Sequence, residues 1–263
     1  RNLRNILEAD VDDNTIKDVA ERIGDAQEVL KSKQFPFRFL SAYRELKTVC
    51  NGKVPIIMDS LEDAVQASAQ NIKGFSKETR VLLACDVSGS MYTPISPKSS
   101  VKNYDIGLVL AMLLRNRCEN VVTGIFGDIW KAVAMPLRGI LSNVEQMYKR
   151  EGEVGYSTNG YKVIEYLRNK NIQMDKVMMF TDCQMWNSYG SGQTIQSEWK
   201  KYKEIAPKAK LYLFDLNGYG QSPLNLVDND VVLIAGWSDR VFDMLDAIEQ
   251  GGNVLAKIKE IEL

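Results

Sequence analysis

The sequence predicts an α/β fold: a mostly parallel, six-stranded sheet flanked by helices and preceded by a short helical segment. From about residue 77, short apolar runs alternate with stretches of helical periodicity, which is the pattern of repeated β-α-β units. Before that point, apolar residues recur only at helical spacing. The chain has 263 residues, 45% of them hydrophobic, which is enough to bury a full core. We therefore expect a helical segment at 1–76 and a sheet domain at 77–263.

Three helices are expected in the first segment. The first begins at a capping box, Thr15-x-x-Asp18, and stops at Gly24. Pro36 and Pro55 open the other two, because proline is tolerated in the first turn of a helix, where no backbone N–H is needed. Helices this short bury little apolar surface by themselves. We expect them to dock on the sheet domain or on further helices.

The sheet domain is expected to contain six strands and five helices. The strands are predicted at Arg80–Asp86, Val121–Phe126, Trp130–Met135, Val177–Thr181, Lys210–Asp215 and Val231–Ala235. The helices are predicted at Asn103–Arg117, Val144–Arg150, Gly160–Asn169, Ile195–Ile205 and Asp239–Glu249. The link between the second and third strands, centred on Gly127-Asp128, has room only for a hairpin. One of these two strands should therefore be an antiparallel edge strand.

The composition disfavours several classes of function. The chain has no histidine, which excludes Ser-His-Asp and Cys-His catalysis and His-ligated zinc, so we expect no enzyme. The net charge of −1 provides no overall attraction to nucleic acid or membranes. No apolar run approaches the roughly 20 residues that span a bilayer, so no membrane association is expected. Four cysteines without CxxC spacing predict mostly buried, reduced thiols and a cytoplasmic protein; they are Cys50, Cys85, Cys118 and Cys183.

A candidate metal site directly follows the first predicted strand, in the sequence Asp86-Val87-Ser88-Gly89-Ser90. Ligand sites of open α/β sheets lie beyond the carboxyl ends of strands. One carboxylate and two hydroxyls at alternate positions are hard oxygen donors that suit Mg²⁺, with Mn²⁺ or Ca²⁺ as alternatives. Thr158 precedes a predicted helix and Asp182 ends a later strand, so both can complete the site. The alternative is that Asp86 and the serines only cap a helix or complete a turn.

These residues resemble the metal-ion-dependent adhesion site of the von Willebrand factor A (vWA) fold, which is Rossmann-like. The predicted strand order and the early hairpin agree with that fold. The resemblance implies that two serines and a threonine ligate the metal, that two aspartates support it through bound waters, and that an acidic group of a partner fills the open position. The residues concerned are Asp86, Ser88, Ser90, Thr158 and Asp182.

Two residues depart from the pattern of that family. Asn159 follows Thr158 where an acid is often seen, which would weaken the affinity for metal. Cys183 follows Asp182 where the fold commonly has glycine, which puts the geometry of that loop in question.

A basic and aromatic stretch lies between Leu30 and Lys53, where a single acid, Glu45, faces six basic residues. Such a stretch can hold phosphates and stack on bases. Because Arg44 and Lys47 fall close together on the Pro36 helix, we expect their charged ends to reach solvent as a pair. The alternative is that the aromatic residues belong to the core and the lysines form a solvated face. The candidate RNA contacts are Lys31, Lys33, Arg38, Arg44 and Lys47.

The same stretch, Phe35-Pro36-Phe37-Arg38-Phe39 and onward, resembles the closing helices of the TROVE module of Ro autoantigen-like proteins. Gly236-Trp237-Ser238-Asp239 also resembles that family. In the family, a ring of helical repeats precedes a vWA domain and binds small noncoding or misfolded RNA, forming a ribonucleoprotein. Most of the helical ring is absent from this sequence, and the family's RNA contacts lie largely on the ring.

Two function classes stay open. The first is binding of small noncoding RNA, with a Mg²⁺ site in the vWA domain. The second is a protein–protein interaction module that grips an acidic residue of a partner through the metal. A phosphoryl-transfer enzyme is least supported, because no second metal or positioned base is visible near the motif.

Overall fold

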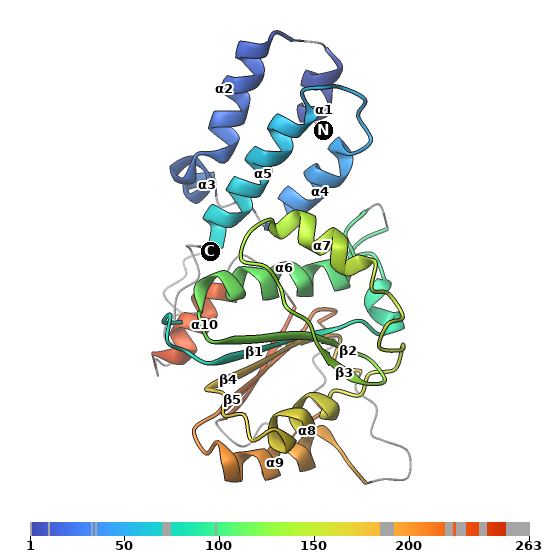
Figure 1. Cartoon of the computed structure of the whole chain (residues 1–263), viewed down its shortest axis with the longest axis vertical. Coiled ribbons are helices and arrows are strands. Elements are labelled where there is room, and N and C mark those ends of the chain that lie inside the picture. The colour runs from blue at the N-terminus through green and yellow to red at the C-terminus, as the bar shows by residue number, and fades with distance from the viewer. Residues whose placement is uncertain are drawn as a thin grey trace.

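Figure 1 shows the computed structural model of the chain, in which the helical segment packs on one side of the sheet domain. The structure describes residues 2–9, 11–32, 34, 36–69, 75–97, 99–184, 192–218, 223–224, 230–236 and 241–250, without the side chains of 242 and 243. The candidate RNA contact Lys33, the end of the third predicted helix at Gly74 and most of the motif 236–239 lie outside these ranges.

The helical segment contains five helices in its described part, so the expectation of three is wrong in number. They are α1 (Asn2–Glu8), α2 (Asp13–Gly24), α3 (Ala26–Ser32), α4 (Pro36–Leu46) and α5 (Val54–Ser68). The predicted capping box is also wrong. Asp12 Oδ1 accepts hydrogen bonds from the backbone N–H groups of Asn14 and Thr15, so Asp12 is the N-cap and Thr15 already lies inside α2. Pro36 and Pro55 do lie in the first turns of α4 and α5.

The sheet has six strands in the spatial order β3-β2-β1-β4-β5-β6. All neighbouring pairs are parallel except β2 and β3, which form the predicted hairpin and place β3 as an antiparallel edge strand. The third strand is shorter than predicted. The strands are β1 (Val81–Asp86), β2 (Val121–Phe126), β3 (Trp130–Ala132), β4 (Lys176–Thr181), β5 (Lys210–Asp215) and β6 (Val231–Ala235).

Helices cover both faces of the sheet, with α6, α7 and α10 on one face and α8 and α9 on the other (Figure 1). In the described part of the sheet domain, the helices are η2 (Gly89–Tyr92), α6 (Asn103–Arg117), α7 (Ile140–Tyr148), α8 (Tyr161–Asn169), α9 (Ile195–Ile205) and α10 (Val241–Glu249). Side chains of β1 alternate between two cores. Leu83 and Cys85 join the core on the α6 side, whereas Leu82 and Ala84 join the core on the α8 side. Because both faces are covered, β1 is apolar throughout.

The helical segment shares one continuous core with the α6 side of the sheet domain. Leu61 and Val65 of α5 belong to the same cluster of buried side chains as Ile140 and Leu141 of α7. Glu62 of α5 accepts hydrogen bonds from the backbone N–H groups of Leu141 (2.9 Å) and Ser142 (2.7 Å). A carboxylate at this position satisfies free N–H groups at a helix N-terminus. It explains why α7 begins four residues before the predicted start at Val144.

Candidate functional site

The Asp86–Ser90 loop leaves the carboxyl end of β1 and turns directly into η2. Asp86 Oδ1 accepts a hydrogen bond from the Ser88 N–H at 2.8 Å, which closes a tight turn at the end of the strand. The hydroxyls of Ser88 and Ser90 lie 3.3 Å apart. Asp86 and Ser88 are buried, and Ser90 is half-buried. The three side chains therefore gather their oxygens at one point on the rim of the sheet.

The loop that carries Thr158 lies against this turn. The Gly89 N–H donates to the Tyr156 carbonyl at 3.2 Å, and Thr158 is buried. Asp128, in the β2–β3 turn, supports the loop from behind: its Oδ1 accepts from the Ser157 N–H at 2.9 Å. Asn159, which departs from the family pattern, donates from its side-chain amide to the Asp128 carbonyl at 3.1 Å. Asn159 thus helps to hold the threonine loop.

Gly155 is required for this close approach of the two loops. Its φ of +78° lies in the left-handed region. A Cβ at this position would stand 2.1 Å from Asp128 Oδ2, which no side chain can tolerate. The glycine therefore lets the threonine loop pack on the β2–β3 turn.

Asp182 approaches the site from the neighbouring strand. Because Cys85 pairs with Phe180 across β1 and β4, the residues that follow these strands lie side by side. Thr181 Oγ1 donates to Asp86 Oδ2 at 2.6 Å and accepts from the Cys183 N–H at 3.1 Å. Cys183 has a φ of +58°, so the backbone takes the conformation expected of the glycine that the family commonly has there.

Two buried carboxylates, Asp86 and Asp182, lie close together at this rim. Burial, together with the nearby carboxylate of Asp182, raises the pKa of Asp86 to about 7, although hydrogen bonds from Thr181 and Ser88 oppose the shift. Asp182 Oδ2 is buried and makes no hydrogen bond within the described residues. A buried carboxylate oxygen without a donor is costly unless something positively charged meets it.

The donor set fits a hard cation that is held mainly by neutral oxygens. Where the structure describes the chain, no group of three or more Cys, Asp or Glu side chains is arranged to hold a metal. A cation at this rim would therefore depend on the hydroxyls of Ser88, Ser90 and Thr158 and on water, with two carboxylates behind them. Mg²⁺ and Mn²⁺ accept such oxygen ligands, and neither requires histidine or thiolate.

The candidate RNA contacts differ in their exposure to solvent and in their ion-pair partners. Lys31 and Arg38 are exposed; Lys31 pairs with Glu28 at 3.3 Å, and Arg38 makes no ion pair with any residue the structure describes. Arg44 and Lys47 do not reach solvent as a free pair, so that expectation is wrong.

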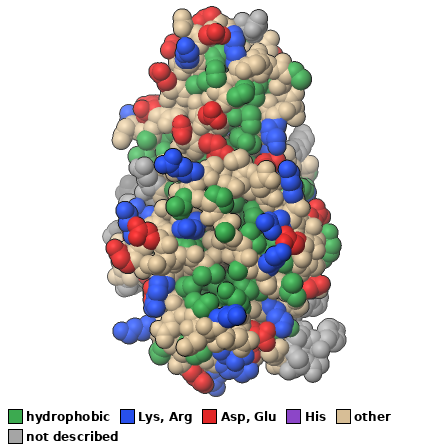
Figure 2. All heavy atoms as spheres, in the orientation of Figure 1, with side chains coloured by type: hydrophobic (Ala, Val, Ile, Leu, Met, Phe, Trp, Pro, Cys, Tyr) green, Lys and Arg blue, Asp and Glu red, His purple; other side chains and the backbone are tan. Residues whose placement is uncertain are grey.

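Figure 2 shows Lys and Arg side chains interspersed with acidic ones over the helical segment on the face in view. That face carries no continuous basic patch.

Arg44 is instead part of the contact between the helical segment and the sheet domain. Its Nη1 and Nη2 donate to the two carboxylate oxygens of Asp105 at 2.7 Å each, and its Nε donates to Glu145 at 2.6 Å. Lys47 Nζ donates to the other oxygen of Glu145 at 3.1 Å. The Arg44 side chain is 18% exposed, and that of Asp105 is 0% exposed. Asp105 and Glu145 were not predicted as its partners, because they lie 61 and 101 residues away in sequence.

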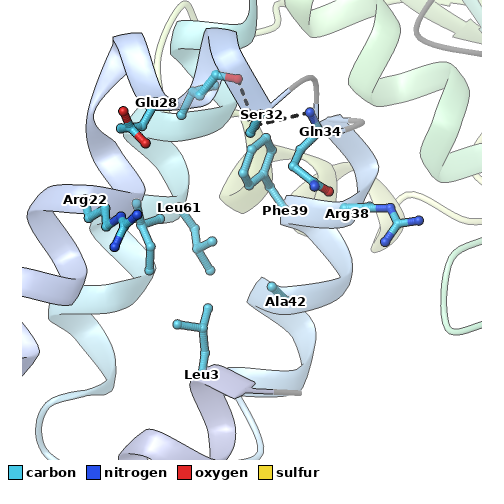
Figure 3. Close-up of a pocket in the computed structure, with 11 residues that line it drawn as sticks. Leu3, Arg22, Glu28, Ser32, Gln34, Arg38, Phe39, Ala42 and Leu61 are labelled. Atoms are coloured by element: carbon cyan, nitrogen blue, oxygen red, sulfur yellow. Dashed lines mark hydrogen bonds between the residues drawn. The ribbon is translucent and has the colours of Figure 1, made fainter.

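An apolar hollow of about 390 Å³ opens between the helices of the first segment. Leu3, Phe39 and Leu61 line it, with Glu28 and Gln34 toward one end (Figure 3). Arg38 also lines the hollow, but its guanidinium extends away from it. Phe39 thus belongs to the wall of a hollow, whereas Arg38 presents its charge to solvent.

Comparison with known families identifies both parts of the chain. Residues 80–248 match the family model of the Ro60 vWA domain, and residues 1–80 match that of the TROVE domain. This chain belongs to the Ro60 vWA domain family. The resemblance to TROVE and vWA modules predicted from the sequence is therefore confirmed. No curated protein matches the chain.

Among solved structures, a longer protein has a fold similar to that of this Ro60-type chain. The crystal structure of the Deinococcus radiodurans RO (RSR) protein superposes with a TM-score of 0.70 at 20% identity, over 95% of this chain and 52% of that one. The chain thus spans about half the length of that protein. An aerotolerance-related membrane protein from Bacteroides fragilis reaches a TM-score of only 0.34 at 14% identity, over 70% of this chain and 96% of that one. Within the described residues, no helix is both long enough and apolar enough to cross a membrane.

Proposed function

We propose that this chain binds small noncoding or misfolded RNA as part of a Ro-type ribonucleoprotein, and that its vWA domain binds a divalent cation, Mg²⁺. The cytoplasm is the proposed location, and no catalytic role is proposed. The family membership supports the RNA-binding role. The observation that carries the proposed metal site is that the Asp86–Ser90 loop, the Thr158 loop and the end of β4 meet at one rim, where Asp182 Oδ2 is buried with no hydrogen-bond partner among the described residues.

In the proposed site, Ser88, Ser90 and Thr158 would hold the cation, with Asp86 and Asp182 supporting it. A bound ion would supply an electrophilic centre with a position open to an anionic oxygen. Thr181 fixes the orientation of the Asp86 carboxylate through its 2.6 Å hydrogen bond, which a supporting residue of a metal site requires. Mn²⁺ is an alternative occupant with the same preference for oxygen, and Ca²⁺ would need more ligands than these loops present.

Titration calorimetry with Mg²⁺ and Mn²⁺ tests the metal site. Ser88→Ala should abolish measurable binding, because it removes one of the three hydroxyls. Ser76→Ala is a matched control, because Ser76 lies before β1, at the opposite end of the strand, where it hydrogen-bonds with Thr79. Equal affinity in the two variants would contradict the assignment.

RNA contact is proposed at Lys31 and Arg38, which are exposed, and at Lys33 and Lys47; Arg44 is committed to Asp105 and Glu145. The test is sequencing of RNA that copurifies with the full chain at moderate ionic strength, followed by gel-shift titration. The double variant Lys31→Glu, Arg38→Glu should bind the recovered RNA more weakly, because two phosphate contacts are lost. Lys200→Glu is the control, since Lys200 is exposed on α9, beyond the sheet from the helical segment (Figure 1).

The second candidate function is metal-dependent protein binding through an acidic group of the partner. Two exposed apolar side chains favour it: Tyr156, in the threonine loop, is 56% exposed, and Ile129, in the adjoining β2–β3 turn, is 53% exposed. If a protein is the main partner, chelation of the cation should abolish its binding while Lys31→Glu, Arg38→Glu leaves it unchanged. If RNA is the partner, the double variant should weaken binding even in the presence of a chelator.

A further inference from the structure

Helix α4 of the helical segment contacts the vWA domain at the loop that follows the candidate metal site. Arg44 Nη1 donates to the carbonyl of Ser100 at 3.0 Å, in addition to its two bonds to Asp105. Asp105 Oδ2 also accepts from the backbone N–H of Lys102 at 2.8 Å. Arg44 therefore holds the end of the loop 93–102 and the first turn of α6 together.

Backbone hydrogen bonds connect that loop to the serine of the metal motif. The Thr93 N–H donates to the Ser90 carbonyl at 3.2 Å, and the Asn103 N–H donates to the Thr93 carbonyl at 3.2 Å. The Ile95 N–H donates to the carbonyl of Val101 at 3.0 Å, which closes the loop on itself. A shift of the first turn of α6 would thus be passed to Ser90 through the two backbone hydrogen bonds at Thr93.

A cluster of aromatic rings provides a second connection. Tyr92, the last residue of η2, stacks on Tyr104 of α6 with ring centroids 5.3 Å apart and meets the edge of Tyr148 of α7 at 5.8 Å. The guanidinium carbon of Arg44 lies 5.9 Å from the Tyr148 centroid. Lys102 Nζ lies over the rings of both Tyr92 and Tyr148, at 5.3 and 4.8 Å. Arg44 therefore meets Tyr148, one of the rings packed against Tyr92 of η2.

We infer that Arg44 is a positioning residue for the divalent-cation site: a side chain from the helical segment sets the loops that hold Ser88 and Ser90. The inference rests on the proposed metal binding. The inference goes beyond that binding because it makes the cation site depend on a residue outside the vWA domain. Arg44 touches neither serine, so it acts through Asp105, the loop 93–102 and the tyrosine cluster. By thermodynamic reciprocity, a cation at the site stabilises the docking of α4 by the same factor that docking increases affinity for the cation.

The test measures Mn²⁺ affinity of the full chain by titration calorimetry. Arg44→Met should weaken binding about tenfold, which lies within the usual range of coupling between separate sites. Arg44→Lys should restore part of the affinity, because lysine keeps the charge but not the forked contact with both Asp105 oxygens. Arg80→Met is the matched control: Arg80 also makes a forked contact, with Asp175 at 2.7 and 3.3 Å, but at the opposite end of β1.

Hydrogen exchange supplies a readout that needs no variant of Arg44. Mn²⁺ should slow amide exchange in α4 of the wild-type chain, and it should have no such effect in Asp86→Asn.

If Arg44→Met does not fold, Glu145→Gln replaces it, since this change weakens the 2.6 Å contact to Nε and leaves the pair with Asp105 intact. A smaller loss of affinity is then expected.

The outcomes separate the two proposals. No Mn²⁺ binding by the wild-type chain would overturn the metal site itself. Binding by the wild type with equal affinity in folded Arg44→Met, or exchange in α4 that is indifferent to Mn²⁺, would overturn the positioning role and leave the metal site standing.

Discussion

Replacing Asp86 with asparagine should stabilise the metal-free protein while abolishing its response to Mg²⁺. Asp86 is fully buried beside Asp182, and burial raises its pKa to about 7 from the ordinary 3.8. Asparagine has nearly the same shape and no charge. The change therefore removes the charge that is costly without a cation and also removes a carboxylate that the proposed metal site needs. A purely structural Asp86, serving only as a turn residue, would not produce this combination.

The magnitude follows from the difference in pKa between the folded and unfolded states. Because the pKa of Asp86 is raised in the folded state, the folded wild type is most stable below pH 3.8, where Asp86 is protonated in both states. That stability is lost as the pH rises toward 7. Each pKa unit corresponds to about 1.4 kcal/mol, so the wild type loses on the order of 4 kcal/mol above pH 7 relative to a neutral side chain. At pH 5 the loss is only about 1.6 kcal/mol. The advantage of Asp86→Asn should therefore shrink as the solution is acidified.

Urea denaturation in EDTA at pH 8 and pH 5 measures both quantities. In Mg²⁺ at 100 times the dissociation constant, the wild type should gain about 2.7 kcal/mol and the variant nothing. The reasoning would be refuted by a variant that is less stable than the wild type by the same amount at both pH values in EDTA. That result would mean that the hydrogen bonds to Asp86 outweigh the burial of its charge.

Three further predictions concern the loops and the contact between the segments. Gly155→Ala should weaken Mg²⁺ binding in calorimetry, because a Cβ would collide with Asp128 and displace the Thr158 loop; unchanged affinity would contradict this. Glu62→Gln should lower the free energy of unfolding by about 1 kcal/mol in urea titrations, because a charged acceptor at the N-terminus of α7 is lost; Glu119→Gln, away from that helix end, should not. Cys183→Val should destabilise the chain more than Cys183→Gly in thermal unfolding, because a β-branched residue fits poorly at a φ of +58°, and the reverse order would count against strain there.

The sequence was sufficient to predict the sheet and the loops of the candidate site because both depend on local patterns. The apolar runs locate the strands, and the carboxyl ends of β1 and β4 then lie side by side by the rules of parallel sheets. The start of α7 was misplaced because its N-terminus is held by Glu62, a residue nearly 80 positions earlier. The cap of α2 was misassigned because Asp12 and Thr15 both suit that role, and only the backbone decides between them.

Arg44 shows most clearly where local sequence reasoning fails. Within the Lys31–Lys53 stretch, a count of charges shows a strong basic excess. In the structure, Glu28 of the same helix meets Lys31, and carboxylates from other elements meet two more of these cations: Asp105 and Glu145 meet Arg44, and Asp13 meets Lys53 at 3.2 Å. No charge pattern along the chain could reveal partners that lie 40 to 100 residues away.

This neutralisation limits the electrostatic part of any RNA affinity of the chain. For single strands, the logarithm of affinity falls with the logarithm of salt concentration with a slope of about −0.7 per phosphate contact. All five predicted cations acting together would give a slope of about −3.5. With Arg44 committed to Asp105 and Glu145, the four remaining proposed contacts give an expected slope of about −2.8. Filter-binding titrations between about 50 and 300 mM salt measure this slope, and a value of about −3.5 would show that RNA displaces the carboxylates from Arg44.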